Sequence, residues 1–122
     1  MPKENLKAIE TLITNYFEGI FFGDVIKLEA CFNKEVTIYG DIKGVVHLKN
    51  LNDYLKEVKN RQSPKGLNEL LTMKIISIEI IGEIAMAKLN VPMLGYNYYD
   101  YLSLVKINMD WRIVNKIFTH VE

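Results

Sequence analysis

The sequence predicts an α+β domain in which helices come first and a mostly antiparallel sheet follows. Three observations lead to this class. Apolar residues recur at three- and four-residue steps in the first third of the chain, as they do along one face of a helix. Apolar and polar residues alternate in the second half, which is typical of strands. Turn-forming residues interrupt that alternation at Gly82-Glu83 and Asn108-Met109-Asp110.

The totals set limits on what the chain can be. Its 122 residues are expected to form one domain, residues 1–122, large enough for a core without disulfides. Lysine plus arginine and aspartate plus glutamate both total 15, so no overall charge favours nucleic acid or a membrane surface. We expect neither partner. Charged residues near the amino terminus and a lone Cys31, expected to be buried, favour a cytoplasmic protein.

Three helices are expected in the first half. The first spans Lys3 to Phe22, and Gly23-Asp24 ends it and caps a short second helix. A third helix should begin after Asn50. Their inward stripes comprise Leu6, Ile9, Leu12, Ile13, Tyr16, Phe17, Ile20 and Phe21, then Val25, Leu28, Cys31 and Phe32, then Leu51, Tyr54, Leu55 and Val58.

Strands are expected between and after these helices. Two short strands, Glu35 to Tyr39 and Val45 to Leu48, flank a loop at residues 40–44. Met73 to Ile81 and Ile84 to Val91 should form a hairpin with a two-residue type II′ turn. That turn places Ile80, Ile78 and Ile76 opposite Ala85, Ala87 and Leu89. Large residues against small ones either leave room for a cavity or let a helix approach closely. Residues 92–97 are expected to form a loop at the mouth.

The last hairpin, Tyr98 to Phe118, is expected to organise the sheet. A three-residue turn would bring the odd positions of both strands onto one face, and we assign that face to the core. A two-residue turn would instead mix odd and even positions. The odd set is Tyr101, Ser103, Val105, Ile107, Trp111, Ile113, Asn115 and Ile117. Leu102, Leu104, Val114 and Phe118 would then lie on a mixed face that a partner subunit covers.

The layout carries a family resemblance. The helix that ends in Gly23-Asp24, the Phe32 that closes the second helix, and the ending DYLSL…WRIVNKIF together resemble the nuclear transport factor 2-like superfamily. Within it, the chain is similar to bacterial proteins labelled putative lumazine-binding or polyketide-cyclase-like. The resemblance implies a cone in which three helices close a strongly curved sheet, with a pocket at one end and a homodimer formed through the sheet. Asn33 and Asn108-Met109 depart from the His and the Asp-Gly that many relatives have.

Ketosteroid isomerases of the superfamily offer the sharpest comparison. Tyr16 matches their oxyanion-binding Tyr, whereas the position of their catalytic base falls on Gly40, next to Asp41. The position of their second oxyanion donor, an Asp that its surroundings keep protonated, falls on Ser103. A serine hydroxyl can donate a hydrogen bond but does not reproduce that carboxylic acid. With one part of three present, the chain is not expected to be a ketosteroid isomerase.

Other polar and aromatic residues are weaker candidates for a functional site. Tyr16, Ser103 and Asn115 are predicted to converge on one cavity, with Tyr101 and Trp111 on the same odd face, or else to satisfy one another. Asp100, at an even position, is assigned to the dimer side. His47 and His120 lack neighbours at metal-ligand spacing, so neither a metal nor a cofactor is expected.

Three functions remain open at this point. The first is a protein that binds a small apolar or aromatic molecule, with or without a carbonyl, in a hydrophobic pocket. The second is a cofactor-independent isomerase, dehydratase or cyclase-like enzyme with Asp41 or His47 as base and Tyr16 as hydrogen-bond donor. The third is a dimeric interaction module without a ligand. The residues leave open whether there is turnover.

Overall fold

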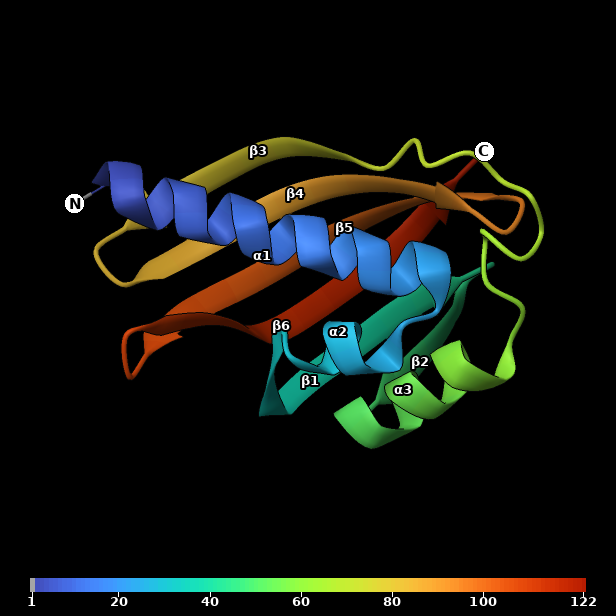
Figure 1. Ribbon diagram of the computed structural model, residues 1–122. Helices are drawn as coiled ribbons and strands as arrows, with labels where there is room; N and C mark the ends of the chain where they lie inside the picture. The colour runs from blue at the N-terminus through green and yellow to red at the C-terminus, as the bar shows by residue number, and fades with distance from the viewer. Residues whose placement is uncertain (1) are drawn as a thin grey trace.

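The computed structural model describes residues 2–122, so Met1 of the expected domain lies outside the described residues. One curved sheet has helices against its inner face, and the core fills the space between them (Figure 1). The elements in chain order are α1 (Pro2–Phe22), α2 (Val25–Glu29), β1 (Phe32–Ile42), β2 (Val45–Lys49), α3 (Leu51–Asn60), β3 (Lys74–Ile81), β4 (Ile84–Met93), β5 (Tyr96–Ile107) and β6 (Asp110–Val121).

Within residues 2–122 the sheet has six strands in the order β2-β1-β6-β5-β4-β3, and only the β1–β6 pair is parallel. The long α1 lies along the inner face of the sheet, while α2 and α3 lie at the end formed by β1 and β2 (Figure 1). This arrangement confirms the predicted α+β class with three helices and a mostly antiparallel sheet. None of the described helices is both long and apolar enough to cross a membrane.

The corner between α1 and α2 follows from two adjacent residues. Gly23 adopts a positive φ of 68°, which suits the residue after a helix end. Asp24 then accepts a hydrogen bond from the backbone N–H of Lys27 at 3.1 Å and caps α2. Gly19 lets the two helices touch, because a Cβ there would stand 2.9 Å from the Cβ of Leu28. Both caps were predicted, as was the Asn50 cap of α3.

Strand β1 is longer than its sequence pattern indicates. It continues through Gly40 to Ile42, and the expected loop shrinks to Lys43-Gly44, both at positive φ. The reason is that β1 pairs with β2 on one side and with β6 on the other, so ladder hydrogen bonds hold residues of weak strand propensity. The predicted loop at residues 92–97 shortens in the same way to the turn Leu94-Gly95.

The β3–β4 hairpin has the predicted register as far as Ser77, where Ile80 lies opposite Ala85 and Ile78 opposite Ala87. A bulge at Ile76 then places Ile75, rather than Ile76, opposite Leu89. Ala85 and Ala87 are buried in the core that α1 covers. The small residues therefore let a helix approach, which is one of the two predicted uses.

The β5–β6 hairpin corrects the predicted faces. Its turn has two residues, Asn108 and Met109, both at positive φ, and Ile107 pairs with Asp110. The even positions of β5 consequently face the core. Leu102 and Leu104 are fully buried there and do not form a partner face. The odd residues Tyr101, Ser103, Val105 and Ile107 point to the outer face instead.

A bulge at Val114 changes which residues of β6 face the core. Trp111 and Ile113 are buried before the bulge, as predicted. Beyond it Lys116 takes the inward position, and Asn115 and Ile117 turn outward. The assignment of Asn115 and Ile117 to the core was therefore wrong.

Candidate functional site

Four polar side chains from four elements meet inside the cone. The hydroxyl of Tyr16 on α1 donates a 2.6 Å hydrogen bond to Oδ2 of Asp100 on β5. Nζ of Lys116 on β6 donates to the hydroxyl of Tyr54 on α3 at 3.0 Å. Tyr16, Asp100 and Lys116 are exposed by only 0, 2 and 5 %. We call these four residues the buried polar cluster.

Local sequence places each member of the cluster. Tyr16 belongs to the apolar stripe of α1, and Tyr54 to that of α3. Asp100 is an even residue of β5, which the two-residue turn directs inward, and the bulge at Val114 does the same for Lys116. The ammonium of Lys116 also lies over three rings, 4.4 Å from the centroid of Tyr54, 5.1 Å from that of Tyr16 and 5.2 Å from that of Phe118.

Burial shifts the acid–base properties of the Tyr16–Asp100 pair. It raises the pKa of Asp100 above its usual 3.8, and the opposing pull of the Lys116 charge and of the Tyr16 hydrogen bond does not cancel that rise. Burial, followed by the charge of Asp100, raises the pKa of Tyr16 well above 10.0. Tyr16 therefore remains a phenol that donates, while Asp100 holds a proton more readily than a carboxyl group in water.

A cavity of about 40 Å³ adjoins the cluster. Asp100, Lys116 and Tyr54 line one part of it, and Lys49, Glu57 and Arg61 line the part beside α3 and β2. The remaining wall is apolar and comprises Ile20, Ile42, Val91, Met93, Tyr98 and Phe118. Since one water needs roughly 10–15 Å³ by this measure, the space admits a few waters or one small functional group. It is far below the roughly 300–1,000 Å³ of a drug-sized site.

Phe118 is one reason that the cavity is small. A side chain at Gly40 would collide with the ring of Phe118, which fills the space on the inner side of β1. Gly40, which stands at the position of the catalytic base of ketosteroid isomerases, therefore has no side chain to act as a base, and the ring of Phe118 covers it.

Charged groups beside α3 are only partly paired. Lys49 forms an ion pair with Glu57, and Nη1 of Arg61 lies 3.6 Å from Oε1 of the same carboxylate. Nε and Nη2 of Arg61 are buried and have no hydrogen-bond partner within the described chain. Burial lowers the pKa of Lys49, and the positive charges of Arg61 and Lys116 lower it further.

Comparison with known proteins identifies the family. The sequence pattern of the family described as Putative lumazine-binding matches residues 4–119. The chain belongs to this family. Two solved structures confirm the nuclear transport factor 2-like fold of this family member. One is a protein of unknown function from Silicibacter pomeroyi DSS-3, with a TM-score of 0.86 and 21 % sequence identity, and the match covers 99 % of both chains. The other is a protein of unknown function from Shewanella baltica OS155, with a TM-score of 0.86 and 22 % sequence identity, and the match covers 100 % of this chain and 98 % of that chain.

A curated relative carries an activity in its name. Aldolase FrzH of a Cladobotryum species is 28 % identical over 106 residues, which cover 84 % of this chain and 81 % of that protein.

The predicted ligand-binding set does not assemble in the structure. Ser103 and Asn115 pair with each other on the outer face, where Nδ2 of Asn115 donates to Oγ1 of Thr37 at 2.9 Å. Tyr101 is 45 % exposed on the same face. The indole of Trp111 is buried beside α1 and donates to Oδ1 of Asn5 at 3.3 Å. Of the five residues, only Tyr16 belongs to the buried polar cluster.

The predicted bases lie elsewhere too. Asp41 accepts a 3.2 Å hydrogen bond from Thr119 near the end of β1, and His47 on β2 lies opposite Gly40. Neither lines the cavity beside the cluster. Asp100, assigned to the dimer side, is instead the inward carboxyl group. Sequence reasoning missed Asp100, Tyr54 and Lys116, although the two-residue turn, which the sequence left open, would have directed Asp100 inward.

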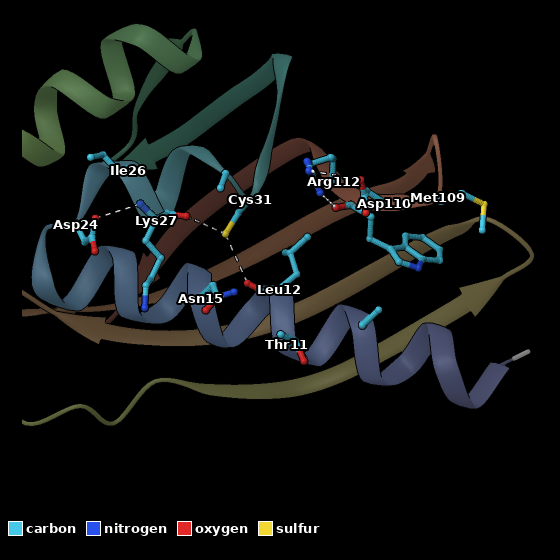
Figure 2. A pocket seen from close by; sticks show the side chains of 13 residues that line it. Thr11, Leu12, Asn15, Asp24, Ile26, Lys27, Cys31, Met109, Asp110 and Arg112 are labelled. Atoms are coloured by element: carbon cyan, nitrogen blue, oxygen red, sulfur yellow. Dashed lines mark hydrogen bonds and ion pairs between the residues drawn. The ribbon is translucent and has the colours of Figure 1, made fainter.

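A larger hollow of about 670 Å³ lies on the outside of the molecule, between α1, α2 and the start of β6 (Figure 2). Its charged side chains have partners: Lys27 pairs with Glu18 at 2.9 Å, and Arg112 with Asp110 at 4.0 Å. The thiol of Cys31 donates to the carbonyl oxygen of Leu12 at 3.6 Å. Burial raises the pKa of Cys31 to about 11, so it is a packing residue rather than a ready nucleophile. Among the described residues, no three His, Cys, Asp or Glu side chains lie together as a metal site would require.

Proposed function

We propose that the protein binds a small carbonyl compound in the 40 Å³ cavity beside the buried polar cluster. The observation that carries this proposal is the 2.6 Å hydrogen bond from Tyr16 to Asp100, buried next to the ammonium of Lys116. Burying a carboxyl group and an ammonium is costly, and a merely structural core would not require either. The size and lining of the cavity favour a ligand group that is smaller and more polar than the apolar molecule predicted from the sequence.

Proton transfer at the ligand is a second candidate function. In its ionised form, Asp100 would accept a proton from the carbon next to the carbonyl, and the electron pair of that C–H bond would move to the carbonyl oxygen. Lys116, which lines the cavity together with Asp100, is the donor available to stabilise the resulting enolate, and Tyr16 holds Asp100 in place. The name of the relative supports this chemistry, because an aldol reaction begins with an enolate or its equivalent. Asp100 would then take the role that the sequence offered to Asp41 or His47.

Binding is tested with nitrogen-15 NMR while small ketones and aldehydes are titrated in. The expected result is a set of shifts at residues 54, 100 and 116, which line the cavity, with affinity about tenfold weaker in Tyr16→Phe because Asp100 loses the hydrogen bond that holds its carboxyl group. Tyr39→Phe, on the exposed side of β1, is the matched control and should bind normally. Shifts confined to the outer hollow would contradict the proposal.

Turnover is tested separately by hydrogen–deuterium exchange at the carbon next to the carbonyl of a bound ketone in D₂O. Exchange should require Asp100 and should be lost in Asp100→Asn. Binding without protein-dependent exchange would leave a ligand-binding protein and remove the enzyme.

We also propose that two copies associate through the outer face of the sheet. Tyr39, Met86, Tyr101 and Ile117 present exposed apolar surface there. This patch replaces Leu102 and Leu104, which the sequence assigned to the partner face. Should the cavity prove empty, this face would support the third function, a dimeric interaction module.

A further inference from the structure

Arg61 has an incomplete set of hydrogen bonds in a place where that is costly. Its Nη1 faces Glu57, but Nε and Nη2 are buried without an acceptor in the described chain, and its side chain lines the interior cavity. A buried donor that lacks an acceptor costs about 1–3 kcal/mol, and more when the group is charged. The two free donors therefore favour an acceptor, a water or a ligand group, in the cavity beside them.

The free donors define the shape of that acceptor. In a guanidinium group, Nε–H and one N–H of Nη2 point the same way along one edge, as a two-pronged fork. This edge matches the two oxygens of a carboxylate, which accept both hydrogen bonds at once. Because Glu57 lies beside Nη1, the fork edge is the part of Arg61 that remains free.

The charge around the cavity favours the same class of ligand. Lys49, Arg61 and Lys116 bring three cations to its wall, against the carboxyl groups of Glu57 and Asp100. Glu57 already pairs with Lys49, and burial favours the neutral form of Asp100. A bound anion would offset the mutual repulsion that, together with burial, lowers the pKa of Lys49.

We propose that the ligand carries a carboxylate, which the fork of Arg61 binds with support from Lys49, and that its carbonyl group then lies beside Asp100 and Lys116. This inference rests on the proposed function, since it names the class of molecule for the same cavity. The cavity of about 40 Å³ is filled by a carboxylate alone, which occupies about the space of two or three waters, so the side chains around it must move apart to admit the carbonyl group as well.

The test compares acetoacetate with acetoacetamide, which have the same shape but differ in charge. Both are titrated into the full chain and followed by NMR, including the Nε–H signal of Arg61. We expect the acid to bind about 10- to 100-fold more tightly than the amide and to shift that signal. Arg61→Gln should abolish the preference, and Arg61→Lys should weaken it because the charge stays but the fork is lost. Lys59→Gln removes one positive charge from an exposed site in the last turn of α3, two residues before Arg61, and should change nothing.

The outcomes separate the two proposals. Equal binding of acid and amide, or an Arg61→Lys variant that binds like the unaltered protein, would overturn the carboxylate site while leaving the carbonyl-binding function. Stronger competition by inorganic phosphate than by acetate would also overturn it. Binding of neither probe would count against the proposed function itself and hence against both.

Discussion

Asp100 experiences opposing influences from its neighbours. Burial favours its neutral form, whereas the charge of Lys116 and the hydrogen bond from Tyr16 favour the carboxylate, and burial has the larger effect on its pKa. The folded protein therefore binds a proton at Asp100 more strongly than the unfolded chain does. Stability from this proton is fully present below the unfolded pKa of about 3.8 and is lost as the pH rises through the higher folded pKa.

Replacing Asp100 with Asn should remove this pH dependence. Relative to Asp100→Asn, the free energy of unfolding of the unaltered protein should fall by up to about 1.4 kcal/mol per pH unit above pH 3.8 and level off once Asp100 is ionised. Urea unfolding at a series of pH values measures the difference. Tyr16→Phe removes a hydrogen bond that lowers the pKa of Asp100 in the folded protein, so that pKa should rise further. The pH range over which the free energy of unfolding falls should then extend to higher pH. Parallel curves for the unaltered protein and Asp100→Asn would show that the carboxyl group is not shifted.

At the scale of elements, the β5–β6 hairpin decides which residues form the site. Its two-residue turn puts two non-glycine residues at positive φ, 50° at Asn108 and 73° at Met109. Asn tolerates this region, whereas Met does so at a cost of about 1–2 kcal/mol. The turn persists because the ladder beyond it buries Leu104 against Ile113.

Met109→Gly should stabilise the protein by about 0.5–1 kcal/mol. Glycine removes the positive-φ cost, although it also adds entropy to the unfolded chain. Little packing is lost, since Met109 is 80 % exposed. Thermal and urea unfolding measure the gain. Met109→Ala is the matched control and should show no gain, because alanine keeps the Cβ; equal stabilisation by alanine would assign the effect to the methionine side chain.

At the scale of the whole molecule, the sheet has one covered face and one open face. The helices cover the inner face, and the core lies beneath them (Figure 1). The outer face presents Tyr101 and Ile117 as neighbours on paired strands, with Lys88 opposite Tyr101 on the other side. An apolar strip on an otherwise complete fold is typical of an interface.

Ile117→Lys should convert the proposed dimer to a monomer. Ile117 is 41 % exposed at the centre of the outer face, and a charge there would be buried without a partner on association. Sedimentation velocity at micromolar concentration measures the assembly. Leu70→Lys introduces the same charge at an exposed residue outside the sheet and should leave the dimer intact. An unaltered protein that sediments as a monomer would contradict the proposal.

Much of the fold could be predicted because its signals are local. The stripe of α1, the Gly23-Asp24 corner, the Asn50 cap and the turn at Gly82 depend on residues within a few positions of one another. The resemblance to the nuclear transport factor 2-like superfamily is likewise confirmed by the structural neighbours. Tyr16 was found for the same reason, since it lies on a well-defined helical stripe.

The rest of the site could not be predicted, because a strand has a period of two. One residue of difference in the β5–β6 turn sends every side chain of β5 to the opposite face, and the bulge at Val114 then reverses the part of β6 that follows it. Local sequence patterns were enough to predict the helices, their caps, the approximate positions of the strands and the burial of Tyr16. The placement of Asp100 and Lys116 beside Tyr16, and of Ser103 and Asn115 on the outer face, follows from the folded chain, because strand register depends on packing across the whole sheet.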